Sequence, residues 1–128
     1  MDKSEKINNF CDLEVWQKAN RLTLLVYHYT KDFPKEEMFG IISQMRRAAS
    51  SIMANIAEGF ARFHFKDKTR FYYFARGSVA ELRSFSMLSR GLDYLEYDKC
   101  QEVIDQADEV GRLLNGLINS VKKVSKLS

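Results

Sequence analysis

Four long segments of this chain repeat apolar residues every three or four positions, and a single proline, Pro34, falls between the first two. This period places the apolar side chains on one face of an α-helix. No run alternates valine, isoleucine or threonine with polar residues, as a half-buried strand does. The pattern therefore predicts an all-α protein, an antiparallel up-down-up-down four-helix bundle with helices over residues 13–31, 36–60, 66–92 and 98–124.

The ends of these helices carry residues that commonly start or stop a helix. Asp12 is expected to cap the first helix, and Pro34 breaks the chain before the second. Gly59 is the predicted C-cap of the second helix, and Asp98 with Gln101 resembles a capping box for the fourth. The resulting organisation is a flexible N-terminal segment, a bundle and a C-terminal tail, over residues 1–12, 13–124 and 125–128.

The apolar stripes define the predicted core. A chain of 128 residues that is 45% hydrophobic is long enough for one domain with a core of its own. The predicted core residues are Trp16, Ala19, Thr23, Val26 and Tyr27; Ile42, Met45, Ala49, Ile52, Ile56 and Phe60; Phe71, Phe74, Ser78, Leu82 and Phe85; and Val103, Ala107, Val110, Leu114, Leu117 and Val121.

The first and third helices carry further apolar rows outside this predicted core. Water does not readily keep a regular apolar row exposed, so we expect these rows to form the interface of a homo-oligomer. The alternative is a scatter of single exposed apolar residues, which is common on protein surfaces. The predicted interface residues are Leu22, Leu25 and Tyr29 on the first helix and Tyr73, Ala80 and Met87 on the third.

Positive charge is concentrated in the third quarter of the chain, although the net charge is only +3. The basic residues there are Lys66, Lys68, Arg70, Arg76, Arg83 and Arg90. The three last arginines recur every seven residues and span about 21 Å of helix. Aromatic residues between positions 60 and 76 interleave with the basic ones and are suited to stacking on unpaired bases. This surface is predicted to contact RNA or DNA; a solvated arginine row is the alternative.

The second helix has an unusual polar face opposite its apolar stripe. Arg47, Ser51, Asn55 and Glu58 fall on that face, which favours an assembled or partner-facing surface over a catalytic site. Two further charged residues, Arg46 and Glu81, lie at the edges of the apolar stripes of their helices. An unpaired charge is costly in such a position, so these two are expected to pair.

No pattern of catalytic, metal-binding or cofactor-binding residues is recognisable, and we expect a protein that is not an enzyme and has no cofactor. His28 and His64 lie outside the Glu-x-x-His pattern of di-iron bundles. Cys11 and Cys100 are expected at opposite ends of the bundle, about 25–30 Å apart, too far for a disulfide. No apolar run reaches the roughly 20 residues that span a bilayer, and no signal peptide is recognisable, so a cytoplasmic protein without membrane contact is expected.

Several motifs together carry a family resemblance. They are Leu13-Glu-Val-Trp16, Phe33-Pro34, Gln44-Met-Arg46-Arg47-Ala-Ala, Ser51-Ile-Met-Ala-Asn55-Ile-Ala-Glu58-Gly59, Ala75-Arg76-Gly77-Ser78 and Glu81-Leu82. With these motifs, about residues 12 to 95 resemble the small bacterial four-helix-bundle proteins encoded within intervening sequences of 23S ribosomal RNA genes. Met53 departs from the family pattern, which often has proline at this position.

The resemblance implies a bundle that assembles into a ring, commonly a pentamer. The family is similar to the accessory variability protein of diversity-generating retroelements, so nucleic acid and a reverse transcriptase are implied partners. It also implies an intersubunit or end-surface polar network of Arg46, Arg47, Ser51, Asn55, Glu58 and Glu81. The predicted function is that of a non-enzymatic accessory factor associated with nucleic acid or ribonucleoprotein. The alternative is a protein-interaction scaffold that binds no nucleic acid.

Overall fold

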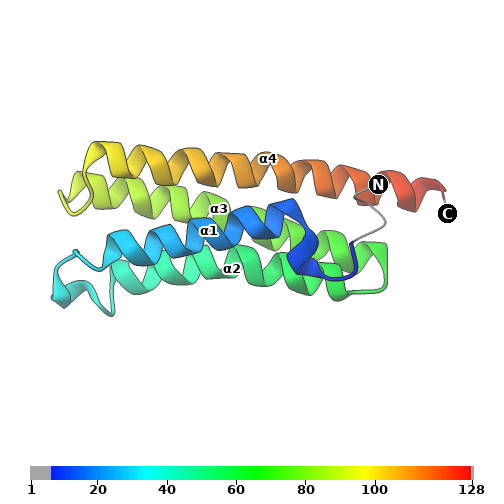
Figure 1. Ribbon diagram of the computed structural model, residues 1–128, viewed down its shortest axis with the longest axis horizontal. Helices are drawn as coiled ribbons and strands as arrows, with labels where there is room; N and C mark the ends of the chain where they lie inside the picture. The colour runs from blue at the N-terminus through cyan, green and yellow to red at the C-terminus, as the bar shows by residue number, and fades with distance from the viewer. Residues whose placement is uncertain (1–6, 128) are drawn as a thin grey trace.

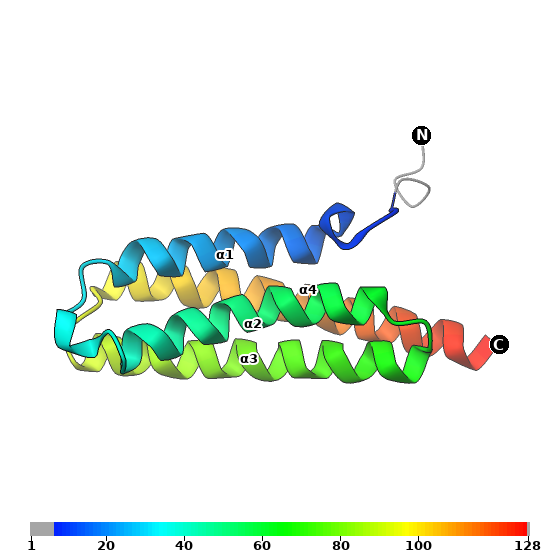
Figure 2. The same cartoon turned by 90° about the horizontal axis from the view of Figure 1, so that it is seen from below.

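The computed structural model describes residues 7–127, which form four long antiparallel helices (Figures 1 and 2). The helices are α1 (Glu14–Thr30), α2 (Ile41–Ala61), α3 (Phe65–Gly91) and α4 (Tyr97–Leu127). Short 3-10 helices, η2 (Phe10–Asp12) and η3 (Lys35–Glu37), precede α1 and α2. Each long helix packs on the next along the chain, and α4 also packs on α1. No strand occurs in this part of the chain, and the predicted up-down-up-down bundle is confirmed.

The start of α2 and the cap of α1 differ from the prediction. Helix α2 begins at Ile41, five residues later than predicted, because Pro34 leads into η3 and a turn that ends at Gly40. Leu13, and not Asp12, is the N-cap residue of α1. The Asp12 carboxylate instead accepts hydrogen bonds from the backbone N–H groups of Asn8 and Asn9, 3.0 and 3.4 Å away, and so caps η2.

The α3–α4 turn and the end of α4 also depart from the predicted bounds. Helix α4 begins at Tyr97, which puts Asp98 inside its first turn, and the Gln101 amide donates to Asp105 at 2.9 Å. The predicted capping box is therefore wrong. Asp93 has φ of 61°, a left-handed conformation that aspartate tolerates in a tight turn. Residues 125–127, predicted as a tail, continue α4, and Ser128 lies outside the described residues.

The buried residues of α2 and α4 confirm most of the predicted apolar stripes. Helix α3 buries a different face from the predicted one. Phe74 is 52% exposed, and Phe71 and Phe85 are only half-buried. The buried residues of α3 are instead Tyr72, Ala75, Ser78, Val79, Leu82, Ser86 and Ser89. Burying these serines costs little free energy, because Ser86 and Ser89 each donate a 2.8 Å hydrogen bond to the carbonyl four residues earlier. On α1, Tyr27 is exposed and differs from the predicted core, whereas Trp16 is half-buried and packs against the core.

Helices α2 and α3 approach each other closely at Gly59, which lies within α2 and is not its C-cap. The C-cap is Arg62. The Tyr72 ring lies against Gly59, where a methyl group would come within 2.6 Å of a ring carbon. Burial raises the pKa of the Tyr72 phenol to about 12. Beside the ring, the Lys68 ammonium donates to the Phe60 carbonyl at 2.8 Å and caps the end of α2.

The cysteines lie at opposite ends of the bundle, as expected, and both are free thiols. Cys11 is exposed beside η2, whereas Cys100 is buried in the first turns of α4 and donates to the Ser86 carbonyl at 3.4 Å. Burial raises the pKa of the Cys100 thiol. Among residues 7–127, no helix is both long and apolar enough to cross a membrane, and no three His, Cys, Asp or Glu residues are grouped as metal ligands would be.

Candidate nucleic-acid interface

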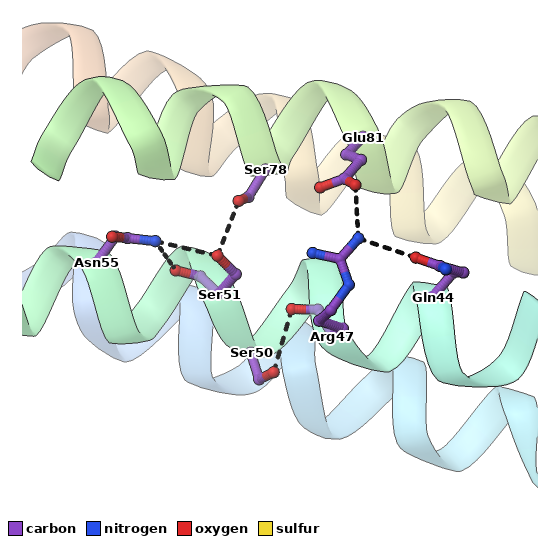
Figure 3. Close-up of polar contacts among 7 residues, drawn as sticks. All are labelled: Gln44, Arg47, Ser50, Ser51, Asn55, Ser78 and Glu81. Carbon is purple, nitrogen blue, oxygen red and sulfur yellow. Dashed lines mark hydrogen bonds and ion pairs between the residues drawn. The ribbon is translucent and has the colours of Figure 1, made fainter. Parts of the chain in front are cut away.

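The polar face of α2 lies against α3 of the same chain (Figure 3). Arg47 forms an ion pair with Glu81 of α3 at 2.7 Å and donates to Gln44 at 2.9 Å. One turn further on, Ser78 of α3 donates to the Ser51 hydroxyl at 3.0 Å. Asn55 donates to the Ser51 carbonyl and hydroxyl, and Glu58 pairs with Arg62 at 2.6 Å within α2 and its C-cap. These contacts set the register of α2 against α3.

Arg46 does not join this network, and the predicted pair between Arg46 and Glu81 is wrong. Successive helix residues point about 100° apart, so Arg47 faces α3 while Arg46 faces α1. Arg46 donates to the Thr30 hydroxyl at 2.9 Å and to the Tyr27 carbonyl at 3.5 Å. Its guanidinium carbon lies 4.6 Å from the centre of the Tyr27 ring. Arg46 consequently has no carboxylate partner among the described residues.

The three arginines at seven-residue spacing lie on one side of α3, as the spacing predicts, and that side faces α4. Arg76 donates to Asn115 at 3.2 Å, and Arg83 pairs with Asp108 at 3.0 Å. The Arg90 guanidinium carbon is 5.4 Å from the centre of the Tyr97 ring. Each arginine therefore has a partner on α4 of its own chain, but only Arg83 has its charge compensated by a carboxylate.

The remaining predicted basic residues lie at the end of the bundle where α3 begins. Lys66 and Arg70 are exposed there, whereas Lys68 is turned inward onto the end of α2 and burial lowers its pKa. Antiparallel packing brings the end of α4 beside them, with Lys122 and Lys126. We call Lys66, Arg70, Lys122 and Lys126 the basic end.

Two shallow grooves open at the basic end. One, of about 360 Å³, lies between α3 and α4 and is lined by Lys66, Lys122 and Lys126. The other, of about 660 Å³, runs along α3, where Lys66 and Arg70 adjoin Tyr73 and Phe74, with Asp67 at its wall. Cationic and aromatic side chains thus line one continuous surface.

Charge is divided between the two ends of the bundle. The basic end lies where α2 and α3 join and α4 finishes, on the right of Figure 2. The opposite end carries more acidic than basic residues. The acidic ones are Asp32, Glu36, Glu37, Asp93, Glu96, Asp98 and Glu102, and the basic ones are Lys31, Lys35, Arg90 and Lys99. The mild net charge of +3 conceals this separation.

Lys122 and Lys126 were not predicted as members of this surface. A signal was present, because the two lysines are one helical turn apart near the end of the fourth helix, and an up-down topology places that end beside Lys66 and Arg70. The prediction considered charge along one helix, whereas this signal appears only when charge is combined with the topology.

The predicted interface rows are only partly on the surface. Leu22 is 0% exposed and belongs to the core, so its prediction as an interface residue is wrong. Leu25 and Tyr29 are half-buried, and the Tyr29 hydroxyl donates to Glu102 of α4, which raises the pKa of the tyrosine. Tyr73 is half-buried, and Ala80 and Met87 are exposed. Other exposed apolar side chains on these helices are Leu24, Tyr27, Phe74 and Leu88.

Comparisons with known proteins agree with the fold. The family model described as 23S rRNA-intervening sequence protein matches residues 11–116. A crystal structure from Bacteroides thetaiotaomicron, described as a protein with unknown function from the S23 ribosomal protein family, superposes with a TM-score of 0.73. It is 20% identical in sequence, and the similarity covers 81% of this chain and 97% of that one. No curated protein sequence matches the chain.

Proposed function

The chain belongs to the 23S rRNA-intervening sequence protein family, and we propose that it is a non-enzymatic, nucleic-acid-associated accessory factor. The observation that carries the proposal is the basic end. Its four cations are exposed, come from two helices, and have no carboxylate ion-pair partner among the described residues. Such cations attract the phosphate backbone and release its counterions on binding.

The proposed ligand is single-stranded RNA or DNA. The groove along α3 places Tyr73 and Phe74 beside Lys66 and Arg70, and the 52% exposed Phe74 ring has an open surface. Unpaired bases stack on such rings, whereas a duplex keeps its bases stacked on each other. Arg83 has a smaller role in this proposal than the sequence predicts, because Asp108 of α4 compensates its charge. Arg76 and Arg90 contact only neutral groups of α4 and keep their charge.

We expect Lys66→Gln with Lys126→Gln to weaken binding of a fluorescent single-stranded RNA and to make it less sensitive to salt. Each lost phosphate contact lowers the slope of log affinity against log salt by about 0.7, so the double variant should lower it by about 1.4. Anisotropy titrations between about 50 and 200 mM salt, the range over which phosphate contacts dominate the change, measure this slope.

The matched control is Lys31→Gln with Lys35→Gln, which removes the same charge from exposed lysines at the opposite end. This control should leave the slope near the wild-type value. A slope lowered equally by both variants means that binding depends on net charge alone and not on the basic end. Absence of binding at low salt favours the alternative function, a protein-interaction scaffold, in which the basic end contacts protein.

We also propose that the protein acts as a homo-oligomer, with the α3 surface of one subunit on α1 of the next. Ala80, Met87 and Leu88 are exposed on α3, and Leu24 is 63% exposed on α1. Helices α1 and α3 are diagonal in the bundle, since each packs on α2 and α4. Unlike surfaces on opposite sides of a subunit form head-to-tail contacts, which close into a ring when the rotation from one subunit to the next divides a full turn. The family resemblance favours a pentamer, and a reverse transcriptase is a further proposed partner.

The oligomer proposal predicts that Met87→Asp lowers the mass of the particle in solution. A carboxylate buried in an apolar contact is costly, so the variant should approach the 14.9 kDa of one chain, while the wild type is a multiple of it. Light scattering after size exclusion measures both masses. Phe63→Asp, at an 88% exposed site outside the proposed contact, should keep the wild-type mass. A monomeric wild type at micromolar concentration contradicts the proposal.

A further inference from the structure

A pocket of about 420 Å³ opens between α1 and α2, apart from the basic end. Its lining combines aromatic, cationic and hydroxyl side chains from α1, α2 and the segment between η3 and α2. The residues used below are Tyr27, Phe39, Ser43, Arg46 and Arg47.

The charge in this pocket comes from Arg46. Its Nε and Nη2 atoms donate to the neutral oxygens of Thr30 and Tyr27, and no carboxylate compensates the guanidinium. Arg47, its neighbour in the pocket lining, has its charge compensated by Glu81. An anion in the pocket would supply the missing countercharge, and a phosphate group suits the planar donor geometry of arginine.

The aromatic wall comes from Phe39 and Tyr27. Phe39 is 97% exposed, so almost none of its ring packs against its own chain. Tyr27 has the Arg46 guanidinium on one face of its ring. A phenyl ring exposed at the rim of a pocket beside an uncompensated guanidinium offers a stacking surface next to an anion site.

We propose that this pocket binds a nucleoside monophosphate, with its phosphate on Arg46 and its base on Phe39. The Ser43 hydroxyl lines the same pocket and is available to a phosphate or sugar oxygen. Neither carboxylate of η3 lines the pocket, and that of Glu37 accepts hydrogen bonds from the Tyr94 hydroxyl at 2.9 Å and the Ile41 N–H at 3.5 Å. This site is separate from the basic end and does not depend on the proposed binding of longer nucleic acid.

The experiment is a titration of the ¹⁵N-labelled full chain with adenosine monophosphate, followed by amide chemical shifts. We expect saturable changes in chemical shift that are confined to residues 38–50, which include the start of α2, and to the end of α1. Adenosine and inorganic phosphate, titrated separately, should each bind more weakly than the nucleotide, because each uses one half of the pocket. Phosphate that binds as tightly as the nucleotide overturns the proposal and leaves an anion site only.

Two variants test the base-binding half and the phosphate-binding half of the pocket separately. Phe39→Ala should weaken nucleotide binding at least about fivefold, as loss of one stacking contact does, and should not affect folding because the ring is exposed. Arg46→Gln should weaken the nucleotide and phosphate together. The matched controls are Phe63→Ala, an exposed ring elsewhere, and Arg21→Gln, an exposed arginine of α1. Equal affinity in wild type and Phe39→Ala, or shifts centred on α3 and α4, overturns the proposal.

Discussion

Replacing Leu22 with alanine is expected to lower the free energy of unfolding by about 2–5 kcal/mol. The side chain is 0% exposed and packs with Val26 of α1 and the residues of the facing helices in one core. Removing it costs the transfer free energy of the lost methyl groups and leaves a cavity that close-packed neighbours fill only in part. Urea denaturation followed by circular dichroism measures the loss.

Leu127→Ala is the matched control, because it makes the same chemical change at a site that is 82% exposed and lies outside the proposed α1–α3 contact. Its effect on unfolding should stay within about 0.5 kcal/mol, as is usual on a surface. Equal effects of the two substitutions contradict the placement of Leu22 in the core.

Gly59→Ala is expected to destabilise the bundle by about 1–3 kcal/mol, although alanine is the better helix former. The added methyl group would lie 2.6 Å from a ring carbon of Tyr72 and 3.1 Å from the Lys68 carbonyl oxygen. The ring is buried and the carbonyl is backbone, so α2 and α3 must separate to make room. A shift of the thermal or urea midpoint measures the effect.

Gly77→Ala on α3 is expected to raise the stability of the bundle, the opposite of the effect of Gly59→Ala. Nothing lies within 4 Å of the position that its methyl group would take, so only the helix propensity changes. A gain of about 0.5–1 kcal/mol is expected. A stabilising Gly59→Ala would mean that Tyr72 moves aside easily, and that close approach is not the reason for glycine at this position.

The helices were predictable because their periodicity is long and regular, whereas their ends depended on local contacts. The proline and glycine around the start of α2 signalled a break, but no pattern distinguished helix from the 3-10 turn at residues 35–37. Asp12 was assigned to the wrong helix because its carboxylate can cap either α1 or the shorter η2. Such choices differ by a few hydrogen bonds and are decided by packing.

The buried face of α3 was not predictable from hydrophobicity. Residues 71–74 are all aromatic, and four consecutive rings point in every direction around a helix, so only packing decides that Tyr72 is inside. Ser86 and Ser89 read as polar surface, yet bonding to their own helix lets them be buried against neighbouring helices. The prediction therefore put Phe74 inside and missed the serines.

Most residues of the candidate site could be predicted, but not which of them pair with each other. The polar face of α2 was predicted to face a partner, yet it packs on α3 of the same chain, and the arginine that reaches Glu81 is Arg47 and not its neighbour. The distinction depends on which side of α2 faces α3, which the sequence alone does not specify. The role of α4 was missed for a similar reason: its side chains engage the arginines of α3 and its last turns complete the basic end.

The separation of charge along the bundle has a geometric consequence for any polyanion that the protein meets. A phosphate chain is attracted to one tip of the rod and repelled from the other, so the molecule would stand upright on its ligand. The footprint of one subunit would follow the bundle's width, about 20 Å for two helices side by side, and not the roughly 40 Å length of α3. Lengthening the helices would leave that footprint unchanged, and many copies could crowd along one strand.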